Sequence, residues 1–134
     1  MRNYESVQRP AKKTGLENAV RRAIVDFGIP PYIRGYLYIV DAIIIILENK
    51  EKCICSEDII YSKIASKYYT TPARVEKAIH HAVEISWEGL GKNNLKSWFP
   101  EKTDGPENGI FLGFMCKWIN GETEGTPEAN VQSV

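Results

Sequence analysis

Apolar residues recur at the spacing of an α-helix along most of this chain. Between Leu16 and Phe27 they fall three or four positions apart, as one face of a helix requires. Thr14 and Glu17 stand at the spacing of a capping box, in which each side chain accepts a hydrogen bond from the other residue's backbone amide. We therefore expect a first helix that begins at Thr14 and stops at Gly28.

The next segment, from Pro31 to Asn49, is apolar nearly all round. Its four isoleucines at 43–46 are β-branched and would also suit a strand. The segment is long for a strand, so we predict a helix, with Pro31 at its first position. A helix without a polar face should lie at the centre of the domain.

Two further helices joined by a short polar turn are predicted between residues 56 and 89. Ser56 is a suitable N-cap for the first, and Thr71 followed by Pro72 marks the start of the second. This arrangement is typical of a helix-turn-helix, whose second helix enters the major groove of DNA. The buried side of the first helix is expected to comprise Ile59, Ile60, Ile64, Ala65 and Tyr68.

After Gly89 the pattern predicts a short apolar turn at 95–99, a loop, and a last helix at 110–119. No segment predicts a strand with confidence, so we expect an all-α fold: a single compact bundle of about six helices that contains the helix-turn-helix. This domain would span residues 14–120. We expect a flexible basic arm or linker at 1–13 and an acidic disordered tail at 121–134.

The polar side of the predicted second helix is basic in its first half and acidic in its second. At about 100° per residue it lies opposite an apolar side formed by Val75, Ala78, Ile79, Ala82, Val83 and Ser86. A recognition helix meets base edges with its N-terminal residues, so we predict base contacts from Arg74, Glu76 and Lys77. Predicted contacts to the DNA backbone are Lys63, Lys67, Thr70, Thr71, His80 and His81.

A charged outer side is also what a solvated helix in an ordinary bundle carries. Ala65, a small residue where the two helices would cross, favours the helix-turn-helix. Tyr69 counts against it, because such turns often need a positive φ that a bulky residue adopts at a cost. Adjacent His80 and His81 point about 100° apart and cannot chelate one metal well, so a phosphate contact, a base contact and an uninvolved surface position all remain open.

Charge and cysteine content refine this interpretation. The 17 basic and 17 acidic residues cancel, which counts weakly against nucleic-acid binding, but the segment 101–134 is strongly acidic and the rest of the chain is basic. Cys53, Cys55 and Cys116 lack the partners of a complete metal site and suit a reducing cytoplasm.

Several classes of protein are not expected. The apolar run at 37–47 is too short to span a bilayer. No nucleophile–base pair or phosphate loop stands at a usable spacing, so we expect no enzyme, no catalytic residue, no metal and no cofactor. We expect a cytoplasmic, nucleoid-associated protein that does not bind a membrane.

Two blocks of sequence resemble a known family. GIPPYIRGYLY at 28–38 and YYTTPARVEKAIHHAVEISW at 68–87 are similar to the C-terminal DNA-binding effector domain of the sporulation initiation response regulator, stage zero sporulation protein A. The likeness covers about residues 16–120. It implies a six-helix domain that binds double-stranded promoter DNA, often as tandem copies in a possible homodimer, and that contacts the RNA polymerase sigma subunit.

Carried over by position, Arg74, Glu76, Lys77, His80 and His81 fall on the family's DNA-facing helix. Lys77 and His80 stand where the family has arginine, and lysine lacks arginine's planar pair of donors, so we expect a shifted choice of sequence. The family carries a phospho-accepting receiver domain ahead of this region. Only residues 1–13 precede the first predicted helix, so we expect an excised domain or a free-standing relative without a receiver of its own.

Two functions follow from these expectations. The first is a sequence-specific transcription regulator of the sporulation-initiation type, with residues 72–89 as recognition helix in the major groove. The alternative is a protein-interaction module with this fold that contacts the sigma subunit or a related regulator and has little DNA affinity. Its surface would include Trp98 and Phe99, and the zero net charge favours it.

Overall fold

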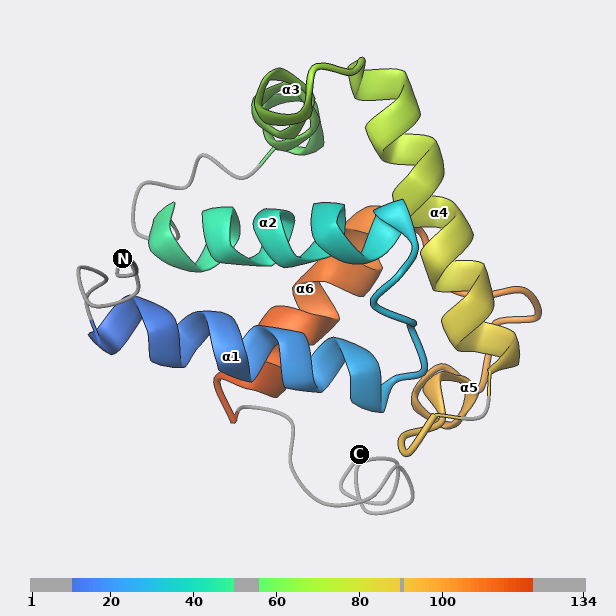
Figure 1. Cartoon of the computed structure of the whole chain (residues 1–134). Helices are drawn as coiled ribbons and strands as arrows, with labels where there is room; N and C mark the ends of the chain where they lie inside the picture. Colours follow the sequence, from blue (N-terminus) through green and yellow to red (C-terminus); the bar gives the residue numbers. More distant parts are fainter. Residues whose placement is uncertain (1–10, 50–55, 90, 122–134) are drawn as a thin grey trace.

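The structure is a computed structural model that describes residues 11–49, 56–89 and 91–121. Within these ranges it contains six α-helices and no strand, which confirms the predicted all-α fold (Figure 1). The helices are α1 (Ala11–Asp26), α2 (Arg34–Asn49), α3 (Glu57–Tyr68), α4 (Pro72–Glu88), α5 (Leu95–Trp98) and α6 (Asn108–Ile119). None of these helices combines the length and the apolar character needed to cross a membrane. The predicted tail at 121–134, apart from Gly121, and the predicted arm at 1–13, apart from residues 11–13, lie outside the described residues.

The isoleucine-rich segment forms the central helix, as its length predicts. Figure 1 shows α2 between α1 and α3, with α4 beside its first turn and α6 crossing it, and α2 contacts all four of these helices. Ile39 and Ile43 are fully buried. An apolar helix at the centre of a domain needs no polar face, because its neighbours cover it on several sides.

Three helix starts differ from the predicted positions. The first helix begins at Ala11, so Thr14 lies inside it and cannot be its N-cap. The second begins at Arg34 because Pro30 to Ile33 form a tight turn, with the Ile33 amide donating to the Pro30 carbonyl at 3.4 Å. The last begins at Asn108, two residues before the predicted start. Capping and proline signals give the type of element more reliably than its first residue.

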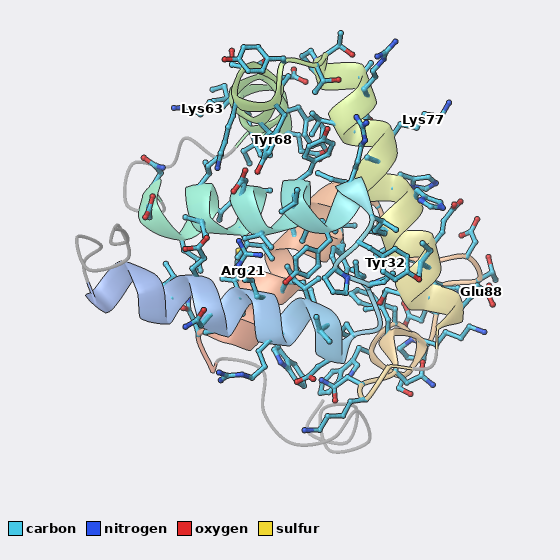
Figure 2. All side chains as sticks on the ribbon, in the orientation of Figure 1. Arg21, Tyr32, Lys63, Tyr68, Lys77 and Glu88 are labelled. Carbon is cyan, nitrogen blue, oxygen red and sulfur yellow. The ribbon has the colours of Figure 1, made fainter. Side chains whose placement is uncertain are left out.

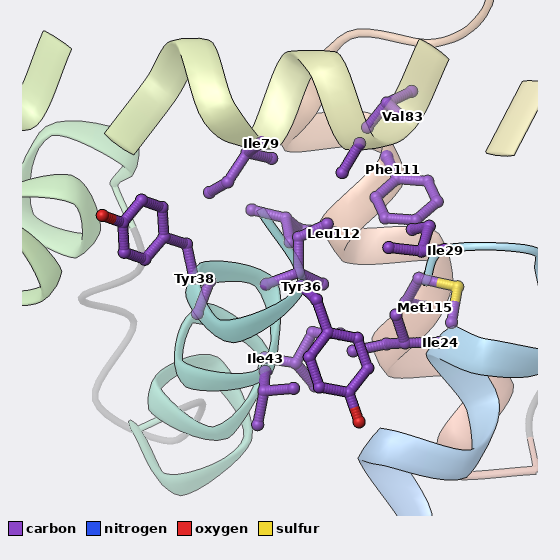
Figure 3. Close-up of a cluster of buried hydrophobic side chains, with 14 of the residues drawn as sticks. Ile24, Ile29, Tyr36, Tyr38, Ile43, Ile79, Val83, Phe111, Leu112 and Met115 are labelled. Carbon is purple, nitrogen blue, oxygen red and sulfur yellow. The ribbon is translucent and has the colours of Figure 1, made fainter. Parts of the chain in front are cut away.

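The core lies where α1, α2, α4 and α6 meet. Figure 3 shows its side chains converging from these helices, and the largest of them are fully buried: Ile24, Ile29, Ile43, Ile79, Phe111, Leu112 and Met115. Half-buried aromatic rings extend the core toward α5, where the Trp98, Phe114 and Trp118 rings pack on one another. Trp98 is therefore part of the packing at the rim of the domain.

Gly35 fixes the distance between α2 and α4. A Cβ atom at this position would overlap the Ala78 carbonyl oxygen and approach the Ala82 side chain to 2.8 Å. The backbones of the two helices can approach this closely only because Gly35 lacks a side chain. The contact sets how α4 lies against the body of the domain, and so which of its sides faces outward.

Candidate nucleic-acid interface

The predicted helix-turn-helix is formed by α3, a three-residue turn and α4. The Ser56 hydroxyl accepts from the Ile59 amide at 3.4 Å and caps α3. The Thr71 hydroxyl accepts from the Arg74 amide at 3.2 Å and caps α4, with Pro72 at its first position. Both predicted N-caps are confirmed. The turn lies at an outer corner of the molecule (Figure 1).

The turn passes through a left-handed residue. Tyr69 has φ 57° and ψ 47°, and the Thr70 amide donates to the Ala65 carbonyl at 3.0 Å to close the end of α3. This is the αL termination that helices commonly use and that usually falls on glycine. The positive φ that the sequence interpretation counted against Tyr69 is therefore present, and the helix pair forms in spite of it.

The inner side of α4 is buried as its apolar pattern predicts. Val75, Ile79, Ala82 and Val83 are at most 1% exposed. Ser86 is also buried, and its hydroxyl donates to the Phe27 carbonyl at 2.6 Å. On α3 the prediction for Ile59 is wrong: its side lies away from the core and the residue is 41% exposed.

The outer side of α4 carries the three predicted base-contacting residues. Arg74, Glu76 and Lys77 are all exposed, and Lys77 points away from the body of the molecule (Figure 2). Among the described residues, neither Arg74 nor Lys77 has an ion pair within 4.0 Å. Their charges are therefore available to a partner.

The second half of the outer side of α4 carries two acidic residues, Glu84 and Glu88. His80 lies 3.2 Å from the Glu84 carboxylate, and both side chains are more than half exposed. His81 is exposed as well. Glu88 closes the helix and stands 4.0 Å from Lys96 of α5. Only the first half of α4 thus presents unopposed positive charge.

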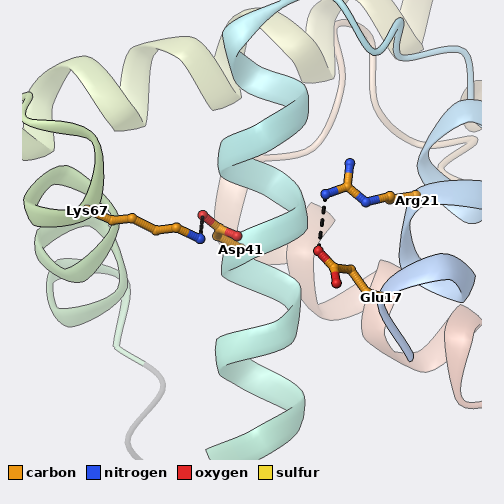
Figure 4. Close-up of polar contacts among 4 residues, drawn as sticks. All are labelled: Glu17, Arg21, Asp41 and Lys67. Carbon is orange, nitrogen blue, oxygen red and sulfur yellow. Dashed lines mark hydrogen bonds and ion pairs between the residues drawn. The ribbon is translucent and has the colours of Figure 1, made fainter. Parts of the chain in front are cut away.

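The two lysines predicted to contact the DNA backbone from α3 have different surroundings. The Lys67 ammonium lies 3.1 Å from Asp41 of α2, as Figure 4 shows. Lys63 and Lys67 both line a hollow of about 240 Å³ that is also bordered by Asp41 and Glu17. In Figure 2, Lys63 and Lys77 lie on opposite sides of the helix pair. The structure therefore does not bring Lys63 and Lys67 together with Arg74 and Lys77.

A buried polar network beneath the helix pair was not foreseen from the sequence. The Tyr61 hydroxyl donates to the Glu57 carboxylate at 2.7 Å and accepts from the Asn108 side-chain amide at 3.2 Å. The Asn108 side-chain amide also donates to the Glu76 backbone carbonyl at 3.0 Å. Burial raises the pKa of Tyr61, and the hydrogen bond to Glu57 raises it further. The hydroxyl therefore stays protonated and can donate to Glu57. The network ties α3 and α4 to the start of α6.

Gly109 at the start of α6 packs closely against the Glu57 side chain. A Cβ atom on Gly109 would overlap the Glu57 carboxylate. In the sequence, residues 107–109 read as part of a loop, so nothing there signals an interhelical contact. The position of the helix-turn-helix on the domain therefore depends on residues that periodicity does not identify.

A polar hollow of about 760 Å³ borders one flank of α4. It lies between α4 and the segment 102–108, which belongs to the predicted loop. Glu76, Lys77 and His80 line it from α4, with Lys102, Asp104 and Glu107 opposite them. Acidic groups thus flank this side of the outer surface, whereas Arg74 and the turn lie outside the hollow.

The geometry gives no sign of a metal centre within the part of the chain that the structure describes. No group of three or more His, Cys, Asp or Glu side chains there is placed to hold a metal ion. Cys53 and Cys55 lie outside the described residues, so their predicted state as plain thiols stays untested.

The fold and the exposed basic half of α4 define a helix-turn-helix domain of the DNA-binding class. The chain belongs to the family described as Sporulation initiation factor Spo0A C terminal, whose family model matches residues 20–119. The resemblance found in the sequence is thereby confirmed. The family is a DNA-binding domain of transcription regulation in sporulation and is not a family of enzymes.

Proposed function

We propose that this chain binds double-stranded promoter DNA with sequence preference, by placing the first half of α4 in the major groove. The observation that carries the proposal is the state of Arg74 and Lys77, which are exposed and have no ion-pair partner among the described residues. Both can donate to guanine, and Glu76 beside them can accept from cytosine.

Contacts to the DNA backbone would come from the turn and the flanks of α4. Thr70, Thr71, His80 and His81 remain proposed phosphate contacts, since they lie at the turn or along the exposed side of α4. Lys67 is a weaker candidate, because its ammonium lies 3.1 Å from Asp41, and so is Lys63, because it lines the same hollow as Asp41 and Glu17. Phosphate contacts fix the register of a protein on the duplex without reading its sequence.

A charge-reversal experiment tests the proposal. Duplexes selected from a random pool by the full chain are labelled, and binding is followed by fluorescence anisotropy. We expect the double variant Arg74→Glu/Lys77→Glu to bind at least about 100-fold more weakly, because two favourable contacts become repulsive. Equal binding by this variant and the wild type would refute the placement of α4 in the groove.

The matched control is Lys92→Glu/Lys117→Glu, which changes the net charge by the same amount. Both lysines are exposed, and their segments lie at the end of the molecule opposite the helix-turn-helix turn (Figure 1). We expect this control to keep most of the affinity. An equal loss in both variants would mean that binding depends on net charge alone.

The alternative function, contact with the RNA polymerase sigma subunit, needs a separate variant in the proposed contact surface. Trp98 and Phe99 are half-buried and pack against α6, so only their outer edges are free for a partner. Equal retention of the sigma subunit by a Trp98→Ala variant and by the wild type would exclude this surface.

Binding as tandem copies would appear as two protein molecules on duplexes with two copies of the selected sequence.

A further inference from the structure

Tyr69 combines a backbone conformation that the turn uses with a side chain that the turn does not require. It is the one residue other than glycine with a positive φ among the described residues. It is also 97% exposed, the highest exposure of any large hydrophobic residue in the described part of the chain. A side chain with a Cβ atom is disfavoured in the left-handed region, and glycine would adopt it without that cost.

No contact within the described part of the molecule offsets this cost. Tyr61 and Tyr68 of the same helix pair are packed, with hydrogen bonds to Glu57 or a ring contact to Tyr38. The Tyr69 ring has no such hydrogen bond or ring contact among the described residues. A strained residue whose side chain stabilises nothing in the fold points to a role toward a partner.

The position of Tyr69 and the charge around it identify the chemistry of that partner. The residue stands in the turn that precedes α4, five positions before Arg74 in the sequence, and neither residue lines the acidic hollow of Asp104 and Glu107. A polyanion drawn to Arg74 would meet this corner. A phenolic hydroxyl is a donor that commonly binds DNA phosphate, and its ring can lie against the sugar.

We infer that Tyr69 is a DNA-backbone contact, with its hydroxyl donating to a phosphate at the edge of the groove that α4 enters. The inference rests on the proposed function. It adds a residue outside the predicted site and assigns it a sequence-independent role, distinct from that of Arg74 and Lys77.

The test is a pair of measurements that should move in opposite directions. Tyr69→Gly removes the left-handed strain, so we expect Tm to rise by roughly 2–6 °C. The same variant loses the phosphate contact, so we expect affinity to fall about 3–10-fold, by the same factor on a selected duplex and on an unrelated duplex of equal length. A purely structural residue would lower both quantities or neither.

Tyr69→Phe removes the hydroxyl and keeps the ring, so it shows which of the two contributes to binding. We expect Tm to stay unchanged and affinity to fall nearly as far as in Tyr69→Gly. Full affinity in Tyr69→Gly, with the Arg74→Glu/Lys77→Glu variant still unable to bind, would overturn the inference and leave the proposed function intact. A wild-type chain that retains no duplex at all would instead overturn the proposed function and the inference with it.

Discussion

The two basic pairs of the helix-turn-helix look alike in the sequence and differ in what surrounds them. Arg74 and Lys77 of α4 are exposed and have no ion-pair partner in the part of the chain that the structure describes. Lys67 of α3 is 61% exposed, yet its ammonium lies 3.1 Å from Asp41. Exposure alone therefore does not show that a cation is available to DNA.

The difference originates in α2. The Asp41 side chain is only 17% exposed on an otherwise apolar helix, and a carboxylate in that position needs a compensating charge. Lys67 supplies it from α3, as Figure 4 shows. Lys67 thus faces a carboxylate of the protein, whereas Arg74 and Lys77 of α4 have no ion-pair partner among the described residues.

The largest effect on DNA binding should come from Arg74 and Lys77, the cations without an ion-pair partner among the described residues. For Lys77→Ala we expect a loss of about 1–3 kcal/mol on the selected duplex and weaker discrimination between that duplex and its single-base variants, because a base contact is lost. Anisotropy titrations against a panel of such variants measure both. Lys117→Ala, on the exposed side of α6, is the control and should bind as the wild type does. A uniform loss on every duplex would instead assign Lys77 to a phosphate.

Loss of the ion pair between Lys67 and Asp41 should change the stability of the fold and not the affinity for DNA. For Asp41→Asn we expect the free energy of unfolding in urea to fall by about 1 kcal/mol, because a partly buried ion pair is lost. DNA affinity should stay within about twofold of the wild type, since the change lies away from α4. Glu84→Gln removes the more exposed pair with His80 and should cost less stability. A large gain in affinity for Asp41→Asn would show that Asp41 restrains Lys67 from reaching DNA.

The helices could be predicted from periodicity because the outer helices bury one side each and α2 is apolar nearly all round. The spacing of Val75, Ile79, Ala82 and Val83 predicts the buried side of α4 correctly, and Ser56 and Thr71 are caps as predicted. These signals are local: a helix face depends on spacing and a cap on one hydrogen bond.

The surroundings of the site residues could not be predicted in the same way. Whether Lys67 is paired depends on Asp41, which lies 26 positions earlier on another helix. The network of Tyr61 and Asn108 joins residues 47 positions apart. A single sequence gives the side of a helix on which a residue lies, but not which neighbour covers that side.

The surroundings of Asp41 should also make stability depend on alkaline pH, through Tyr68. Burial, followed by hydrogen bonding to Asp41, raises the pKa of Tyr68. Because the pKa of Tyr68 is higher in the folded chain than in the unfolded chain, Tyr68 contributes fully to stability below the unfolded-state pKa, near 10. That contribution is lost as the pH rises further. In Tyr68→Phe, the free energy of unfolding should therefore fall less between about pH 8 and about pH 10.5 than in the wild type. Identical pH profiles would show that the pKa of Tyr68 is not raised in the folded chain.

The smallest difference should appear in the salt dependence of binding. Each phosphate that a cation neutralises contributes about 0.9 to the slope of log K against log salt concentration. Arg74→Ala should therefore flatten the slope by up to about that amount if its guanidinium replaces counterions near the groove. Lys63→Ala should leave the slope nearly unchanged, because Lys63 lines the hollow with Glu17 and Asp41. Anisotropy titrations from about 50 to 200 mM salt resolve the two cases. Equal flattening by both variants would mean that α3 also follows the DNA backbone, and the two basic pairs would then differ only in how they are held.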